Sequence, residues 1–158
     1  MIRPANESDR DAIWSILEPT IRAGETYALP RDMSRADALR FWFAPDAEVF
    51  VADEGGIAGT YRLAPNHEGG GAHVANCGFM TAPAAAGRGI GHAMCAHALE
   101  RARERGFRAM QFNFVVSTNE RAVRLWESFG FTTVGRLPEA FLHPKLGYVD
   151  ALVMYLKL

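Results

Sequence analysis

A glycine-rich turn between an apolar segment and an amphipathic helix constrains this fold more than any other feature of the chain. Residues 83–91 read PAAAGRGIG and follow the apolar residues 72–81. Glycine adopts positive φ without penalty and lets backbone amides approach a ligand closely. A helix that begins here adds unpaired N–H groups and a partial positive charge. The segment therefore predicts a strand–turn–helix unit that binds a phosphate or pyrophosphate.

Length and composition predict one domain over residues 1–158, with 49% hydrophobic and 22% charged residues. The formal net charge of −1 argues against a general nucleic-acid or membrane-surface binder. No apolar run approaches the roughly 20 residues of a membrane span, and the N-terminus lacks a signal-peptide pattern. The two cysteines are too few for a disulfide framework. We therefore expect a cytoplasmic protein with free thiols.

Hydrophobic periodicity and turn residues predict the order of strands and helices. We expect helices over 12–21, 34–43, 89–105 and 119–129, and strands over 2–5, 48–52, 57–63, 72–81, 110–116, 131–137 and 148–156. Ser8 and Asp11 resemble a capping box for the first helix, and residues 138–147 link the last two strands. Hairpins followed by strand–helix alternation favour an α/β fold, a mixed sheet with helices on both faces.

Two common phosphate-binding motifs fail to match the turn. A P-loop requires Lys-Ser/Thr after the glycines, whereas His92 and Ala93 follow Gly91 here. The dinucleotide fingerprint requires a glycine where this chain has His92. The phosphate-bearing ligand is therefore sought elsewhere.

Two segments resemble the GCN5-related N-acetyltransferase (GNAT) family. Residues 87–91 (GRGIG), which open a helix, are similar to its acyl-CoA loop, and residues 119–131 (NERAVRLWESFGF) are similar to its second motif. Residues 2–5 (IRPA) are similar to its usual first strand, so the resemblance covers essentially the whole chain. It implies a GNAT fold, with a mixed, mostly antiparallel sheet of about seven strands.

The resemblance also implies acetyl-CoA as the acyl donor and transfer of its acetyl group to an amine. Phe79, Met80 and Thr81 would run beside the pantetheine arm, and Asn119 and Trp126 would lie near its thiol end. The pyrophosphate cradle would be formed by Gly87, Arg88, Gly89, Ile90, Gly91 and His92. The Met80 amide would stabilise the developing oxyanion, which makes Met80 a catalytic candidate.

Three departures from the family pattern affect catalysis. Ala86 stands where the family usually has Gln or Arg, which removes one side-chain contact with the cofactor. Trp126 replaces the Tyr that usually acts as general acid, and an indole N–H cannot shuttle a proton. The strand over 72–81 lacks the usual carboxylate base. The family's proton transfers therefore cannot be carried over unchanged.

Asparagines at 76 and 113 interrupt two apolar strands, where Asn is disfavoured. The pattern resembles the GNAT subgroup that acetylates azetidine-2-carboxylate and other proline analogues, which implies that Asn76 and Asn113 bind substrate and that Asn76 is catalytic. The alternative is that both amides satisfy a bulge or a partner strand. Glu25 and Tyr27 lie in a loop that borders the acceptor site in this family, so they are further candidates for substrate binding, against the alternative of a solvated loop.

The sequence therefore predicts an acetyl-CoA-dependent N-acetyltransferase acting on a small amine, amino acid or imino acid. The alternatives are a protein or peptide N-acetyltransferase and a non-catalytic acyl-CoA sensor. No metal site is expected, because His92, Cys95 and His97 do not share one helix face. By analogy with the family we expect a homodimer, and no nucleic-acid or membrane partner.

Overall fold

The computed structural model describes residues 1–158 as seven strands, four α-helices and three short 3-10 turns. The strands are β1 (Ile2–Pro4), β2 (Glu48–Asp53), β3 (Ile57–Pro65), β4 (Val74–Thr81), β5 (Ala109–Val116), β6 (Thr132–His143) and β7 (Gly147–Lys157). The helices are α1 (Arg10–Ala23), α2 (Arg35–Trp42), α3 (Ile90–Glu104) and α4 (Glu120–Ser128). All predicted strands and helices are confirmed, with ends that shift by at most two residues except at β6, which continues beyond residue 137 to His143.

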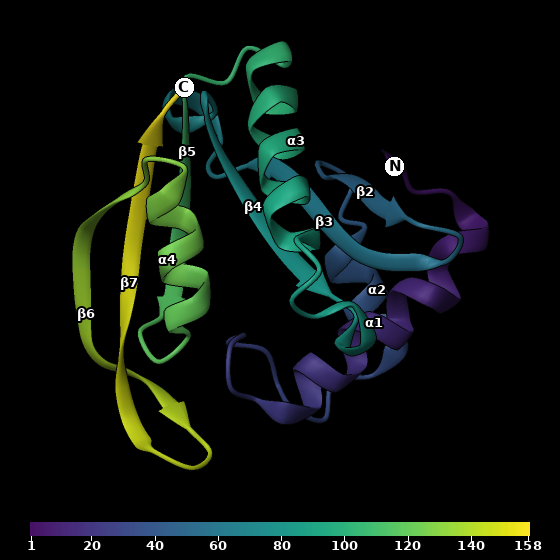
Figure 1. Ribbon diagram of the computed structural model, residues 1–158. Helices are drawn as coiled ribbons and strands as arrows, with labels where there is room; N and C mark the ends of the chain where they lie inside the picture. Colours follow the sequence, from purple (N-terminus) through teal and green to yellow (C-terminus); the bar gives the residue numbers. More distant parts are fainter.

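One mixed sheet contains all the strands, in the order β1-β2-β3-β4-β5-β7-β6. Every neighbouring pair is antiparallel except β4 and β5, which are parallel. These two strands pair only at Val74–Ala109 and Ala75–Met110, and then they diverge (Figure 1). The predicted mixed, mostly antiparallel fold is confirmed, and its single parallel pair opens a gap in the middle of the sheet.

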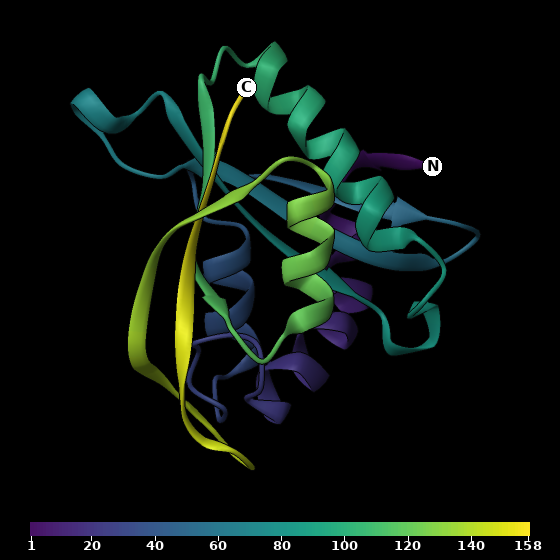
Figure 2. The ribbon, with the colours of Figure 1, turned by 60° about the vertical axis from the view of Figure 1, so that its left-hand side comes forward.

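Helices cover both faces of the sheet, as predicted (Figure 2). Against one face, α3 and α4 bury a large core that includes Met94, Met110 and Trp126. Against the other, α1 and α2 bury a smaller core around Ile13 and Trp42. Side chains of β4 alternate between these cores, because successive residues of a strand point to opposite faces.

The first helical segment begins differently from the prediction. The capping box is formed by Asn6 and Asp9 on a 3-10 turn before α1, and not by Ser8 and Asp11. The Asn6 side chain accepts from the Ser8 N–H, while the Asp9 carboxylate accepts from the Asn6 N–H. Asn6/Asp9 and Ser8/Asp11 both have the three-residue spacing of a capping box, and the 3-10 turn over residues 7–9 places the box at Asn6 and Asp9.

The connection between the last two strands is much shorter than residues 138–147. β6 continues to His143, and only residues 144–146 separate it from β7. Pro138 and Glu139 suggested a loop, but they sit at a register shift where Glu139 has a φ of 49° and its N–H donates to Asp150. A bulge, which local patterns do not reveal, absorbs the turn-like residues inside the strand.

Candidate active site

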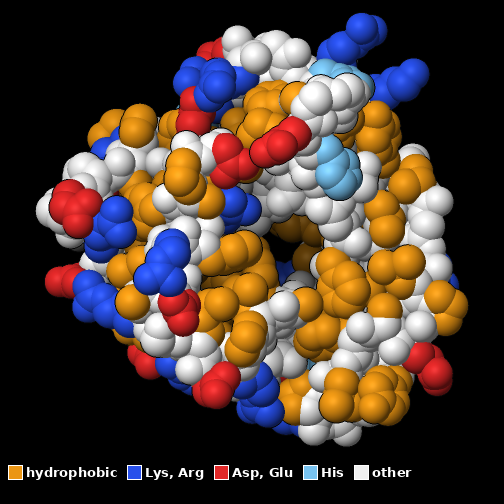
Figure 3. All heavy atoms as spheres, turned by 180° about the vertical axis from the view of Figure 1, so that it is seen from behind, with side chains coloured by type: hydrophobic (Ala, Val, Ile, Leu, Met, Phe, Trp, Pro, Cys, Tyr) orange, Lys and Arg blue, Asp and Glu red, His pale blue; other side chains and the backbone are white.

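The divergence of β4 and β5 creates a cavity of about 470 Å³. At its apex the Asn76 side chain donates to the Gln111 carbonyl at 2.9 Å, just beyond the last paired residues. β5 then bulges between Phe112 and Val115. Figure 3 shows the mouth as a deep hollow edged mostly by hydrophobic side chains. Buried apolar walls with a few polar groups are typical of a small-molecule site.

The glycine-rich turn leads into the N-terminus of α3, as predicted. Gly87 and Gly89 have φ values of 81° and 79°, the left-handed region that glycine tolerates best. The first helical hydrogen bond runs from the Ala93 N–H to the Gly89 carbonyl. The N–H groups of residues 90–92 therefore lack helical partners and remain free for an anion. This backbone fits the pyrophosphate of coenzyme A.

Two arginines lie around this turn. The Arg88 side chain extends to Glu54, with a nitrogen–oxygen distance of 2.5 Å. Arg121, on the first turn of α4, approaches the turn from outside it: a Cβ built on Gly87 would be 3.7 Å from its Nη2. Sequence reasoning missed Arg121, although its place two residues after Asn119 could have suggested a cation close to the cofactor.

The Met80 N–H would have to face the cavity for the predicted oxyanion role, and in the structure it points the other way. The Ala82 N–H donates to the Ala58 carbonyl of β3, and main-chain groups of a strand alternate in direction. Met80, which lies opposite Thr60, therefore points its N–H toward β3 and away from the cavity. The Met80 side chain is buried in the smaller core.

Phe79 and Thr81 direct their main-chain groups to the open edge of β4. Consistent with this, the Tyr27 hydroxyl donates to the Phe79 carbonyl at 3.1 Å. Burial raises the pKa of Tyr27 well above its usual value, so this hydroxyl stays protonated at neutral pH. The free edge beside the cavity fits an extended ligand that adds to the sheet like a strand.

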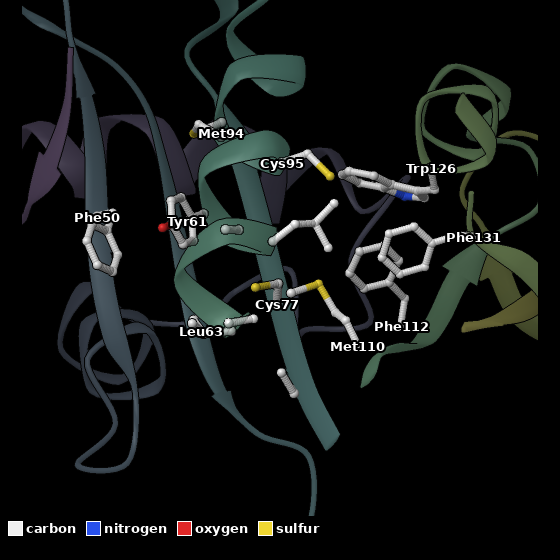
Figure 4. Close-up of a cluster of buried hydrophobic side chains, with 14 of the residues drawn as sticks. Phe50, Tyr61, Leu63, Cys77, Met94, Cys95, Met110, Phe112, Trp126 and Phe131 are labelled. Atoms are coloured by element: carbon white, nitrogen blue, oxygen red, sulfur yellow. The ribbon is translucent and has the colours of Figure 1, made fainter. Parts of the chain in front are cut away.

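Helix α4 contributes the remaining predicted cofactor residues. Asn119 is its N-cap, and its side-chain oxygen accepts from the Ala122 N–H at 3.4 Å. Trp126 is buried and lines the cavity, with its ring centroid 5.0 Å from Phe79 and 4.8 Å from Phe112. Figure 4 shows it pointing from α4 toward α3 above Phe112. Its indole thus forms part of the cavity wall, where it supplies no general acid.

The four predicted substrate residues do not all meet. Tyr27, Asn76 and Asn113 line the cavity, whereas Glu25 does not and instead pairs with Lys145 at 3.2 Å. Asn113 lies in the bulge of β5, and its side chain donates to Asn66. Asn76 hydrogen-bonds the neighbouring strand, and Asn113 lies in a bulge and hydrogen-bonds Asn66. Both asparagines therefore form a structural hydrogen bond and also line the cavity.

Arg62 is a lining residue that the sequence did not indicate. It lies on β3 opposite Gly78 and is half-buried. A Cβ on Gly78 would be 3.1 Å from the Tyr27 hydroxyl and 3.5 Å from Trp42, so the glycine lets these rings close over the strand. Arg62 belongs to a strand read from its apolar residues alone, which is why no signal singled it out.

The histidines and cysteines take no part in the proposed chemistry of the cavity. No group of three or more His, Cys, Asp or Glu side chains is placed to hold a metal. His92 packs on Phe129, and His97 bonds the Tyr61 hydroxyl at 2.6 Å. Burial raises the pKa of Cys95 to about 12 and that of Cys77 well above its usual value. Both thiols are therefore inert as nucleophiles at neutral pH.

The fold and the glycine-rich turn agree with known acetyltransferases. Residues 11–131 match the profile of the acetyltransferase (GNAT) family. N-acetyltransferase aca1 of Schizosaccharomyces pombe is 32% identical over 151 residues, which cover 84% of this chain and 72% of that protein. The chain belongs to the GNAT family. The predicted family is thereby confirmed, together with the acetyltransferase class.

Solved GNAT structures superpose along the full chain. A GCN5-related N-acetyltransferase from Kribbella flavida has a TM-score of 0.95 and 42% identity, covering 100% of this chain and 97% of that one. The putative acetyltransferase yncA from Salmonella typhimurium, solved with its cofactor acetyl-CoA, has a TM-score of 0.88 and 24% identity, covering 100% and 93%. No helix of the present GNAT chain combines the length and hydropathy of a membrane span.

Proposed function

We propose that this GNAT protein transfers the acetyl group of acetyl-CoA to the amine of a small molecule. The observation that carries the proposal is that the open edge of β4 joins two features: its residues Phe79 and Thr81 line the cavity, and the turn that follows it leads to the free N–H groups of residues 90–92. A pyrophosphate fits these N–H groups and an extended pantetheine arm fits the open edge. The two motifs therefore lead to one place where a thioester meets an acceptor.

Acetyl-CoA supplies an activated thioester carbonyl. The acceptor amine attacks that carbon, so a C–N bond forms, the C–S bond breaks to release the thiolate, and the amine proton passes to water. The Phe79 N–H faces the cavity, and we assign it the oxyanion role that the family resemblance implied for Met80. Trp126 supplies no acid, so the thiolate takes its proton from water.

We further propose cyclic imino acids as the acceptor class. Asn76 and Asn113 line the cavity together with Tyr27, in agreement with the pattern that suggested this subgroup. The Nδ2 of Asn76 is bonded to β5, so its side-chain oxygen is the atom left to accept from a substrate N–H.

The test combines calorimetric binding of acetyl-CoA with CoA-thiol release across proline analogues, amino acids, polyamines and N-terminal peptides. We expect binding, and turnover of imino acids above the other amines. Turnover of peptides alone would favour a protein acetyltransferase, and binding without turnover would favour a sensor. Absence of acetyl-CoA binding would overturn the proposal.

A homodimer is the proposed assembly. The outer strand β6, its partner β7 and the turn between them expose the large side chains of Val134, Leu142, Leu146 and Tyr148, each at least 60% exposed. An apolar surface of this kind on an edge hairpin favours association with a second copy. Sedimentation equilibrium should give twice the chain mass, and Leu142→Lys should lower the measured mass to that of a single chain.

A further inference from the structure

Arg62 is the only charged side chain among the residues that line the cavity. The remaining walls are apolar groups, hydroxyls, amides and thiol, without an aspartate, glutamate or lysine. A guanidinium remains protonated at every physiological pH even though burial lowers the pKa of Arg62. The cavity therefore carries one fixed positive charge, which attracts an anionic group and repels a polycation.

The guanidinium is held in place but not neutralised. Its Nε donates to the Trp42 carbonyl at 3.3 Å, and its central carbon lies 4.9 Å from the centre of the Phe41 ring. Asp46 acts on its pKa through space but forms no ion pair with it. The two terminal nitrogens thus have no protein partner, and they form the planar fork that binds a carboxylate through two hydrogen bonds.

The position of this fork suits a short substrate. Arg62 lies opposite Gly78, and Asn76 is two residues away on the same face of β4. Diagonal neighbours of this kind have Cα atoms about 7–8 Å apart. An arginine side chain can cover most of that separation. A carboxylate on Arg62 therefore leaves an amine two bonds away beside Asn76 and the free Phe79 edge.

We propose that Arg62 binds the carboxylate of the acceptor, so that the substrates are small amines with an α-carboxylate. This inference rests on the proposed function and adds the group that selects among amines. It excludes polyamines and decarboxylated amines as good substrates. It also gives the cavity a recognition element that the cofactor path lacks.

The test compares imino and amino acids with their own carboxamides in the wild-type protein and in Arg62→Gln and Arg62→Lys. Arg103→Gln is the control, because Arg103 is exposed on α3 and remote from the cavity lining. Loss of charge-assisted hydrogen bonds predicts a roughly 10- to 100-fold higher KM for acids in Arg62→Gln. The carboxamide KM and the calorimetric Kd of acetyl-CoA should stay unchanged. Arg62→Lys should fall between.

The comparison of acids with carboxamides in the wild-type protein needs no variant, so it tests the inference even if Arg62→Gln fails to fold. Equal turnover of acids and amides would overturn this inference while the proposed function stands. A preference for acids that survives in folded Arg62→Gln would also overturn it. Binding of acetyl-CoA without turnover of any amine would remove the proposed function, and this inference with it.

Discussion

At the scale of single residues, the backbone conformation at Gly89 favours glycine over any other residue. Its φ of 79° lies where a β-branched residue costs roughly 1–3 kcal/mol, and the turn it shapes is the proposed pyrophosphate cradle. Gly89→Val should therefore abolish acetyl-CoA binding by calorimetry. Gly106→Val is the matched control, because Gly106 has a φ of 80° but follows the other end of α3. Gly106→Val should lose similar stability and keep its affinity for acetyl-CoA. An equal loss of acetyl-CoA affinity in both variants would refute the assignment of this turn as the pyrophosphate cradle.

Trp126 tests whether a missing acid limits the rate. Trp126→Tyr places a hydroxyl in the cavity wall, near the expected thiol end of acetyl-CoA. We expect a higher kcat, and a stability loss of about 1–2 kcal/mol from the smaller ring. Trp126→Phe removes similar volume without adding a hydroxyl and should not accelerate turnover. If neither variant is faster, protonation of the thiolate is not rate-limiting.

At the scale of elements, Asn76 joins two strands where their pairing ends. Its bond to the Gln111 carbonyl holds the apex of the cavity, and removing it should cost about 1 kcal/mol in the free energy of unfolding. We expect Asn76→Ala to lower kcat and to leave the Kd of acetyl-CoA unchanged. Asn113→Ala, in the bulge of β5, should raise the acceptor KM instead. An unchanged kcat in Asn76→Ala would leave Asn76 a purely structural role.

Arg3 joins β1, the first 3-10 turn and the end of β2. It contacts Asp9 at 2.8 Å and Asp53 at 2.9 Å, and its hydrogen bonds lower the pKa of both carboxyl groups below 3.8. A lowered pKa stabilises the fold above the unfolded value and loses that contribution as the pH falls below it. Arg3→Leu should therefore lower the urea midpoint at pH 7, and the difference from wild type should shrink below pH 4.

The control for Arg3 is Arg124→Leu. Arg124 pairs with Glu120 at 3.6 Å, and both side chains are more than 70% exposed. Such a surface pair contributes little, so its urea midpoint should match the wild type at both pH values. A difference from wild type that did not change with pH in Arg3→Leu would mean that packing, and not the ion pairs, was lost.

At the scale of the whole molecule, buried acids set the alkaline limit of stability. Burial raises the pKa of Cys77, Cys95, Tyr27 and Tyr61, so the folded protein keeps protons that the unfolded chain loses above about pH 9. The unfolded state binds fewer protons there, and stability must fall as the pH rises. The urea midpoint should drop between pH 8 and pH 10.5, by less in Cys95→Ala. A flat profile would show that these groups are not shielded.

The sequence also determined much of the fold and the chemistry at the cofactor end. The glycine turn, the Asn119 cap and the helical spacing of the residues after it are signals between near neighbours. Such signals predict an element without knowledge of what packs on it. They were sufficient for the family and for the order of strands and helices along the chain, and they led to the proposed pyrophosphate cradle.

Only the tertiary structure decided the rest, because the remaining features depend on pairs far apart in the chain. The β3–β4 register turns the Met80 N–H away from the cavity and leaves that of Phe79 facing it. The same register brings Arg62 into one cavity wall with Asn76, and Glu25 lies outside the cavity, paired with Lys145. A residue's type records its own chemistry, but the direction of its amide and the identity of its neighbours arise only when the strands pair.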